Sequence, residues 1–215
     1  MDESIIKETL RYLGYGNEPA DERTLEMVRQ CAGLLAGRCR PRHISRMVNL
    51  SHADSPEQVC PEGMQGWKSE SLGRALTGCS QMMVFGATLG IEADMLINRE
   101  ASRDISRGAV MAAAASAFIE DYCDKVCAEL AEELKSQGHT LGERFSPGYG
   151  DFELEHQKDI FAILDCENKI GLTLTENLIM IPTKSVTAIM AIDGNCGKQL
   201  GCEFCAKIDC LYRRR

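Results

Sequence analysis

The chain has 215 residues, of which 44% are apolar and 26% are charged, with a formal net charge of -8. This length suits one large domain, or one domain with a small appendage, and the apolar share argues against intrinsic disorder. The acidic balance argues against nucleic acid as the main partner, and the longest apolar stretch, residues 109–119, is far shorter than the roughly 20 residues that cross a bilayer.

Two amphipathic helices are predicted near the N-terminus. Residues 4–13 place apolar side chains at helical spacing and end at Gly14, a favoured residue at the end of a helix. A second helix begins near Asp21 and ends before Gly37. Residues 39–66 contain prolines and glycines but no sustained period, so this segment is predicted to be loop with short pieces of structure.

The middle of the chain predicts one strand and one long helix. Residues 81–90 form a short apolar run closed by glycine, which is typical of a buried strand. Residues 106–137 carry apolar side chains three or four positions apart, which predicts a central packing helix on the order of 40 Å long.

Beyond residue 143 the pattern changes from helix to strand. After a loop over residues 143–150, Asp151 is predicted to cap a helix with Leu154, Ile160, Phe161 and Leu164 on its inner face. Residues 170–175 and 186–192 then alternate with a period of two, which predicts neighbouring antiparallel strands joined near Pro182. Helices first and strands last favour an α+β fold.

Cysteines are concentrated at the C-terminus, where four of the eleven fall in the last 20 residues. They are Cys196, Cys202, Cys205 and Cys210. The N-terminus lacks the features of a secretory signal, so the protein is expected to be cytoplasmic, with reduced thiols. The four thiols then predict a metal site, either structural zinc or an iron-sulfur cluster for electron entry, the alternative being a flexible tail with incidental cysteines. We therefore divide the chain into a domain of residues 1–195 and a Cys-rich basic tail of residues 196–215.

The loop over residues 144–149 is the most suggestive feature outside the cysteines. Arg144 can grip a carboxylate with two hydrogen bonds, Gly148 permits close approach to the backbone, and Tyr149 offers an aromatic face with a hydroxyl. The alternative is an ordinary Ser-Pro-Gly turn between two helices.

Several motifs in the same order resemble the activation domain of cobalamin-dependent methionine synthase. They are Arg-Phe-Ser-Pro-Gly-Tyr at 144–149, Leu-Glu-His at 154–156, Gly-Leu-Thr-Leu-Thr-Glu-Asn at 171–177, Met-Ile-Pro at 180–182 and Ser-Val at 185–186. The resemblance covers residues 85–192 and implies a twisted antiparallel sheet with packed helices. It also implies binding of S-adenosylmethionine, which remethylates an oxidised corrinoid while a flavodoxin- or ferredoxin-like reductant supplies an electron.

The same resemblance implies roles for single residues. Arg144 would hold the methionyl carboxylate, and the pocket would be lined by Ser146, Pro147, Gly148 and Tyr149. Glu120 would face the cationic part of the cofactor, the alternative being a solvated helix face. Asp21 or Glu22 would supply a further acidic contact.

The sequence also departs from the family. Gly150 stands where many relatives have proline, and the second tyrosine expected beyond the sheet has no counterpart before Tyr212. An Asp-x-His-x-x-Gly cobalamin motif is absent from the 215 residues. We therefore expect a stand-alone activation component acting on cobalamin held by a partner methyltransferase. The alternative is a non-catalytic docking or iron-sulfur electron-transfer module that no longer uses S-adenosylmethionine.

Two further sets of side chains have alternative interpretations. Cys123 and Cys127 lie four apart on the long helix and either ligate a metal or pack as small buried residues, the latter being the more common role. The four histidines lack metal-ligand spacing, and His156 is predicted to cap a helix or to line the pocket wall.

Overall fold

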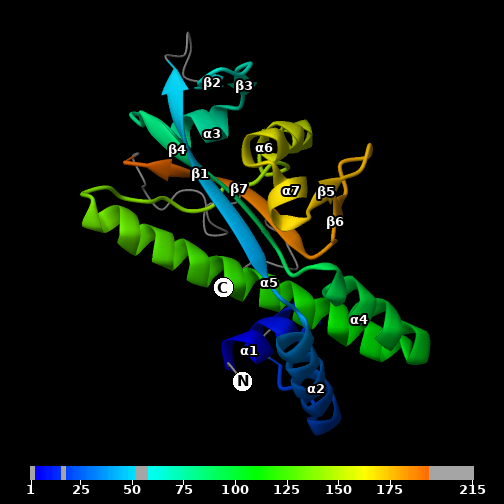
Figure 1. Ribbon diagram of the computed structural model, residues 1–215. Helices are drawn as coiled ribbons and strands as arrows, with labels where there is room; N and C mark the ends of the chain where they lie inside the picture. Colours follow the sequence, from blue (N-terminus) through cyan, green and yellow to red (C-terminus); the bar gives the residue numbers. More distant parts are fainter. Residues whose placement is uncertain (1–2, 16–17, 52–57, 194–215) are drawn as a thin grey trace.

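The computed structural model describes residues 3–15, 18–51 and 58–193, and a curled antiparallel sheet lies at its centre (Figure 1). The five strands have the order β3-β2-β1-β4-β7. Their bounds are β1 Arg42–Ser51, β2 Gln58–Pro61, β3 Trp67–Lys68, β4 Gln81–Thr88 and β7 Ser185–Ile192.

Strand β4 lies between β1 and β7 and carries side chains into two separate cores. It pairs along its whole length with β1 on one side and β7 on the other. Because side chains alternate along a strand, Met83 and Phe85 enter one core while Met82 and Val84 enter the other. Burial on both faces explains why this strand is a continuous apolar run.

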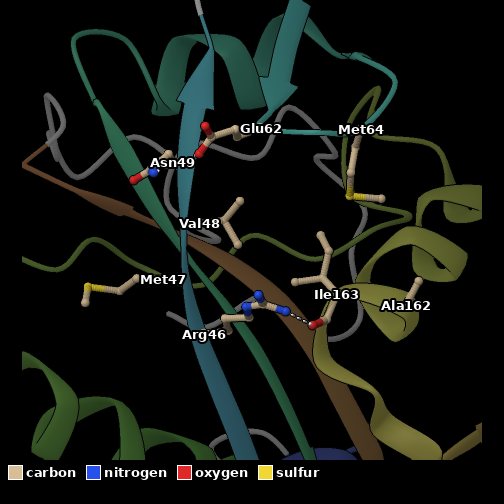
Figure 2. Close-up of a pocket in the computed structure, with 8 residues that line it drawn as sticks. All are labelled: Arg46, Met47, Val48, Asn49, Glu62, Met64, Ala162 and Ile163. Carbon is tan, nitrogen blue, oxygen red and sulfur yellow. Dashed lines mark hydrogen bonds between the residues drawn. The ribbon is translucent and has the colours of Figure 1, made fainter.

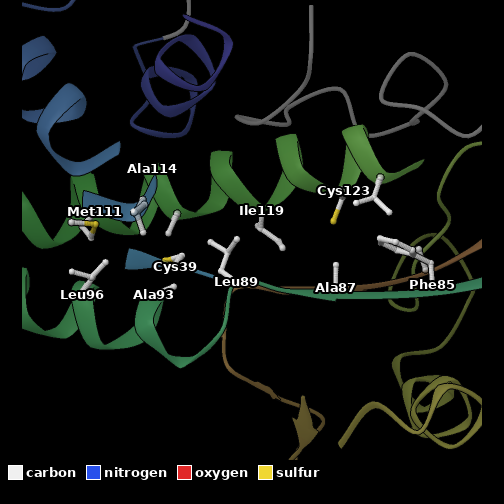
Figure 3. Close-up of a cluster of buried hydrophobic side chains, with 14 of the residues drawn as sticks. Cys39, Phe85, Ala87, Leu89, Ala93, Leu96, Met111, Ala114, Ile119 and Cys123 are labelled. Atoms are coloured by element: carbon white, nitrogen blue, oxygen red, sulfur yellow. The ribbon is translucent and has the colours of Figure 1, made fainter. Parts of the chain in front are cut away.

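One face of the sheet is covered by helices. They are α1 Glu3–Tyr12, α2 Glu22–Arg38, α4 Ile91–Arg103 and α5 Ile105–Ser136. Figure 3 shows side chains of α4, α5 and β4 meeting in this core, among them Leu96, Ile119 and Phe85. Helices α4 and α5 pack closely because Gly108 of α5 lies against Ala101 of α4, where an added Cβ would come within 2.5 Å of the Ala101 Cβ.

The other face is covered by shorter elements. They are α3 Glu70–Ala75, the 3-10 turn η1 Leu154–His156, α6 Gln157–Leu164 and α7 Cys166–Ile170. A two-stranded sheet of β5 Thr173–Leu174 and β6 Met180–Ile181 lies beside them. Together with β2 and β3 they enclose the second core around Trp67, Phe152 and Ile160.

The predicted fold class is confirmed: the structure is α+β, with helices packed on a curled antiparallel sheet. The helices expected near residues 4–13, 21–36 and 106–137 and the strand at 81–90 are present as α1, α2, α5 and β4. The predicted end of the second helix before Gly37 was wrong, since α2 continues through Gly37 to Arg38. Helix α4 lies where the sequence had given no prediction.

Two predictions about strands were wrong. Residues 39–66 are not mainly loop, since they contain β1, a ten-residue strand beside β4. Residues 170–175 do not pair with β7; the short β5 pairs with β6, whereas β7 pairs with β4. Period-two alternation identifies a strand but carries no information on its partner, and the partner of β7 lies about a hundred residues away in the chain.

None of the helices in the described ranges is long and apolar enough to cross a membrane. The predicted tail of residues 196–215 lies outside the described residues, as do all four of its cysteines. The boundary between domain and tail therefore stays a prediction.

Candidate functional site

The chain enters the 144–149 loop from the outer edge of β7. Isolated bridges join Leu141 to Ile192 and Phe145 to Ile189. Phe145 and Ile189 exchange two backbone hydrogen bonds of 2.8 Å, so their register is fixed. Phe145 packs in the second core, and its neighbour Arg144 reaches the opposite way to α5. Edge pairing therefore determines where the Arg144 side chain lies.

The Arg144 guanidinium meets two carboxylates on α5. Its Nη2 donates to Oε2 of Glu120 at 2.9 Å and to Oδ1 of Asp124 at 2.7 Å. The Arg144 side chain is only 16% exposed. Burial by itself lowers the pKa of Arg144, but the neighbouring thiols and carboxylates raise it overall, so the guanidinium stays charged. Because Glu120 and Asp124 are four residues apart, one face of the helix presents both.

Nη1 of the same guanidinium has no hydrogen-bond partner among the described residues, although it is buried. A buried, charged N–H group without an acceptor is costly, and a carboxylate oxygen is the acceptor that suits it best. The site thus combines an unused cationic donor with two carboxylates, which is the polarity that a zwitterionic ligand requires.

Residues 146–149 form a tight turn that leaves an aromatic ring exposed. The Tyr149 N–H donates to the Ser146 carbonyl at 3.1 Å, with Pro147 and then Gly148, at φ +90°, in the middle positions. This is the geometry of a type II β-turn, which explains the Pro-Gly pair. Tyr149 at the end of the turn is 64% exposed. The interpretation as a Ser-Pro-Gly turn is correct locally, and it is compatible with a binding role.

Asp151 fixes the end of the loop to α3, which differs from its predicted role as the cap of the following helix. Its carboxylate accepts from Ser69 Oγ at 2.8 Å, from the Glu70 N–H at 2.6 Å and from the Ser71 N–H at 3.2 Å. Burial acts to raise the pKa of Asp151, but these hydrogen bonds outweigh it and lower the pKa to about 2. Sequence alone could not identify α3 as the helix that Asp151 caps, because the two are 80 residues apart.

Aromatic rings support the loop from behind. Phe145 stacks with Phe152 at 6.0 Å between centroids, and Phe152 stacks with His156 at 5.1 Å. Trp67 lies against Phe152 and donates its Nε1–H to Asp159 at 2.8 Å. His156 thus forms part of an aromatic wall, and its side chain makes no capping hydrogen bond at the start of α6.

The structure brings together Arg144, Glu120 and the 146–149 turn, and it adds Asp124, which the sequence reasoning missed. The i, i+4 spacing of Asp124 from Glu120 was a signal that could have identified it. Asp21 is the N-cap of α2 and accepts from the Thr24 N–H at 2.9 Å, with no contact to Arg144 among the described residues. Its predicted role as a ligand contact is not tested by this arrangement.

Cys123 and Cys127 pack near Arg144. Cys123 is fully buried, and burial raises the pKa of its thiol to about 12. Cys127 donates to the sulfur of Met190 at 3.7 Å, and burial raises its pKa also. These thiols are therefore uncharged packing residues at neutral pH. Within residues 3–193, gaps aside, the structure contains no group of three His, Cys, Asp or Glu side chains that could hold a metal.

Comparison with known proteins gives a consistent result. A family model described as "Vitamin B12 dependent methionine synthase, activation domain" matches residues 84–197. Among solved structures, the chain is similar to one described as "Crystal Structure of the MetH Reactivation Domain bound to AdoHcy", with a TM-score of 0.66 and 16% sequence identity. That match covers 91% of this chain and 76% of the other. A search of curated proteins found no match. Since the family model spans more than half of the sequence, including β4, α5, the 144–149 loop and β7, the chain belongs to the family of vitamin B12-dependent methionine synthase activation domains.

Proposed function

We propose that this chain reactivates a cobalamin-dependent methyltransferase of the methionine synthase type, binding S-adenosylmethionine at the 144–149 loop as the methyl donor to the corrinoid. Membership of the activation-domain family supports the general role. The relative of known structure binds AdoHcy, the demethylated form of that donor, which supports the choice of ligand.

The observation that carries this proposal is the free Nη1 of Arg144 beside Glu120 and Asp124. S-adenosylmethionine has one carboxylate, one ammonium and one sulfonium. The carboxylate would accept from Nη1, and the cationic groups would lie near the two α5 carboxylates. Opposite charges in a site only partly open to water interact more strongly than they would in bulk solvent.

The residues of the site would act by binding and orientation. S-adenosylmethionine supplies a methyl group activated by its sulfonium, so the protein need not act as an acid or a base. Arg144 would fix the amino-acid end, and the exposed Tyr149 ring would cover part of the ligand. The Pro147-Gly148 turn and the Asp151 contact with α3 hold this loop in one conformation, which lowers the entropic cost of positioning.

The remaining partners are also proposals. The family works with a cobalamin-binding methionine synthase, so the corrinoid would be held on a partner chain of that type or on a related methyltransferase. A flavodoxin- or ferredoxin-like reductant would supply the electron. Zinc or an iron-sulfur cluster at Cys196, Cys202, Cys205 and Cys210 would serve structure or electron entry, respectively.

Calorimetric titration of the full chain with S-adenosylmethionine tests the proposal. We expect saturable binding that Arg144→Ala abolishes and Arg144→Lys weakens, since lysine keeps the charge but loses the paired donors. Arg103→Ala is the matched control, because Arg103 is 67% exposed and lies on α4. Thermal unfolding shows whether each variant is folded. No binding at millimolar ligand, or unchanged binding by a folded Arg144→Ala, would exclude this site and favour the non-catalytic docking or electron-transfer alternative.

A further inference from the structure

Strand β1 has a long open edge. It pairs with β4 from Arg42 to Asn49, but on its other side β2 pairs only with Leu50 and Ser51. The Leu50 N–H donates to Ser80 on the β4 side, whereas the Asn49 carbonyl accepts from the Glu62 N–H on the opposite side. Because backbone groups alternate along a strand, those of His43, Ser45 and Met47 point away from β4. No strand in the described part of the chain pairs with them.

A groove runs along this open edge. It has a volume of about 420 Å³ and is lined by Arg46, Met47, Val48, Asn49, Glu62, Met64, Ala162 and Ile163. In Figure 2, Met47 and Asn49 lie on one side of β1 and Arg46 and Val48 on the other, with β4 and β7 behind it. The groove therefore lies at the strand edge, between α6 and the β2-β3 turn. The outward backbone groups along its edge suit an extended polypeptide.

The charge around the edge is opposite to that of the whole protein. Residues 38–51 contain four arginines and not one Asp or Glu, whereas the chain as a whole has a formal net charge of -8. Arg46 donates through Nη1 to the Ile163 carbonyl, which holds its guanidinium at the groove. Glu62, the acidic residue of the lining, already accepts from the Asn49 side chain at 2.8 Å. The apolar side chains of Val48, Met64 and Ile163 complete the groove.

We propose that the β1 edge, residues 43–47, binds an extended acidic segment of a partner protein, which joins the five-stranded sheet as a further strand. Hydrogen bonds to the outward backbone groups of β1 would give affinity, as in other cases of strand addition. Alternate side chains would give specificity: carboxylates on one face of the added strand would lie beside Arg42 and Arg46, and apolar side chains on the other face would lie beside Met47. An open edge of this length is otherwise an aggregation risk, which natural proteins avoid by covering or pairing it.

Charge also argues against two other occupants. A second copy of β1 would bring Arg42 and Arg46 close to their own equivalents, and like charges across paired strands are destabilising. The chain's own residues 196–215 carry five Lys or Arg against two Asp or Glu, so their charge does not complement this edge.

Binding of designed peptides to the full chain tests the proposal. The probe is a capped, fluorescently labelled ten-residue peptide of alternating glutamate and valine, and the control peptide has lysine in place of glutamate. We expect the glutamate peptide to bind, with at least about tenfold higher affinity than the lysine peptide at low salt. Equal affinities, or no binding of the glutamate peptide at millimolar concentration, would overturn the proposal.

Amide hydrogen exchange adds a pattern that simple charge attraction cannot produce. The peptide should protect the amides of His43, Ser45 and Met47, and leave those of Ile44 and Arg46 unchanged because they already bond to β4. Binding without this alternation would overturn the proposal. Full protection of the three amides in the free chain would also overturn the proposal. Protection that depends on protein concentration would indicate that a second copy covers the edge, and protection that does not would indicate that the chain's own residues cover it.

Substitutions at Ser45 and Arg46 complete the test. Ser45→Pro removes one outward N–H without touching the β4 ladder and should weaken peptide binding by about tenfold, whereas Ser45→Thr should preserve it. If Ser45→Pro fails to fold by thermal unfolding, Arg46→Gln replaces it and should weaken the glutamate peptide severalfold. Unchanged affinity in folded Ser45→Pro, or in folded Arg46→Gln where it is used, contradicts the proposal. Neither residue belongs to the 144–149 site, so S-adenosylmethionine binding should stay the same.

Discussion

Asp124 accepts a 2.7 Å hydrogen bond from Nη2 of Arg144, one helical turn beyond Glu120, which accepts from the same atom. Asp124 is 59% exposed and Glu120 is 30% exposed, so water weakens the first contact more than the second. The two carboxylates hold the guanidinium over α5 and leave Nη1 free.

Substitution of these carboxylates should weaken S-adenosylmethionine binding to different extents. We expect Asp124→Asn to reduce affinity by no more than about fivefold, because exposed ion pairs contribute at most about 1 kcal/mol, and Glu120→Gln to reduce it more. Asp121→Asn is the control, since Asp121 lies on the same helix but pairs with Lys125. Calorimetry measures the dissociation constant of S-adenosylmethionine for each of the three variants. Equal affinity in all three would show that neither Glu120 nor Asp124 contributes to binding.

Gly148 should be sensitive to substitution because of its backbone conformation. At φ +90°, a Cβ is strained, so Gly148→Ala should lower the free energy of unfolding by about 1–2 kcal/mol and distort the turn. Gly37→Ala is a matched control, for which we expect a change in the free energy of unfolding of the opposite sign. Gly37 lies within α2 with no atom within 4 Å of an added Cβ, so alanine should stabilise the protein by about 0.5–1 kcal/mol. Urea unfolding distinguishes the two outcomes, and a neutral Gly148→Ala would argue that the turn is loose.

Glu100 should be important for stability. Its side chain is 2% exposed and lies between Arg99, Arg103 and Arg107. The distance from Glu100 Oε2 to Arg107 Nε is 2.9 Å. Glu100→Gln keeps the shape of the side chain but leaves the arginine donors without a charged acceptor. We expect it to cost about 2–3 kcal/mol in urea unfolding, given that the three arginines are partly solvated. Glu22→Gln, which changes an 84% exposed carboxylate, should cost almost nothing; similar losses in both variants would contradict the prediction.

Low pH should weaken the same network. The hydrogen bond from Arg107 is the largest of the effects that hold the pKa of Glu100 below its ordinary value of 4.5. A carboxylate with a lowered folded-state pKa contributes its full stability above the unfolded-state pKa and loses it as pH falls through the folded-state value. The difference in unfolding free energy between wild type and Glu100→Gln should thus shrink below about pH 4.5.

Asp151 provides a more local pH prediction. Its pKa of about 2 lies below the ordinary 3.8, so its contacts with α3 should be intact at pH 4 and above and be lost as pH falls toward 2. Carboxyl NMR titration checks the value directly. Asp151→Asn should cost about 1 kcal/mol, as loss of a helix cap does, and should increase amide exchange at Glu70 and Ser71. A normal titration near pH 4 would show that the contact does not persist in solution.

The C-terminal cysteines can be tested by metal analysis. Anaerobically purified protein should contain one metal centre, and broad absorption at roughly 400 nm would identify an iron-sulfur cluster rather than zinc. Changing Cys202 and Cys205 to serine together should remove the metal, while Cys123→Ser should not, because the Cys123 thiol is buried and uncharged. Absence of any bound metal would contradict the predicted metal site and favour the alternative of a tail with incidental cysteines.

The local elements of this protein are determined by its sequence. Helices α2 and α5 and strand β4 follow from apolar periodicity, and the start of α2 follows from capping by Asp21, because these depend on neighbours within a few residues. The Pro147-Gly148 turn is determined in the same way. Arg144 and Tyr149 were candidates from their residue types, whereas Glu120 was identified only through the order of several motifs along the chain.

Strand pairing and the contacts of the site were decided by the tertiary structure. β1 was missed because it is exposed on much of both faces and therefore lacks the simple alternation of a half-buried strand. Asp151 caps a helix 80 residues away, and Arg144 reaches α5 only because Phe145 pairs with Ile189. These contacts join residues distant in sequence, so the local pattern does not encode them. They form when the two faces of β4 are buried, which brings α5, β7 and the 144–149 loop together.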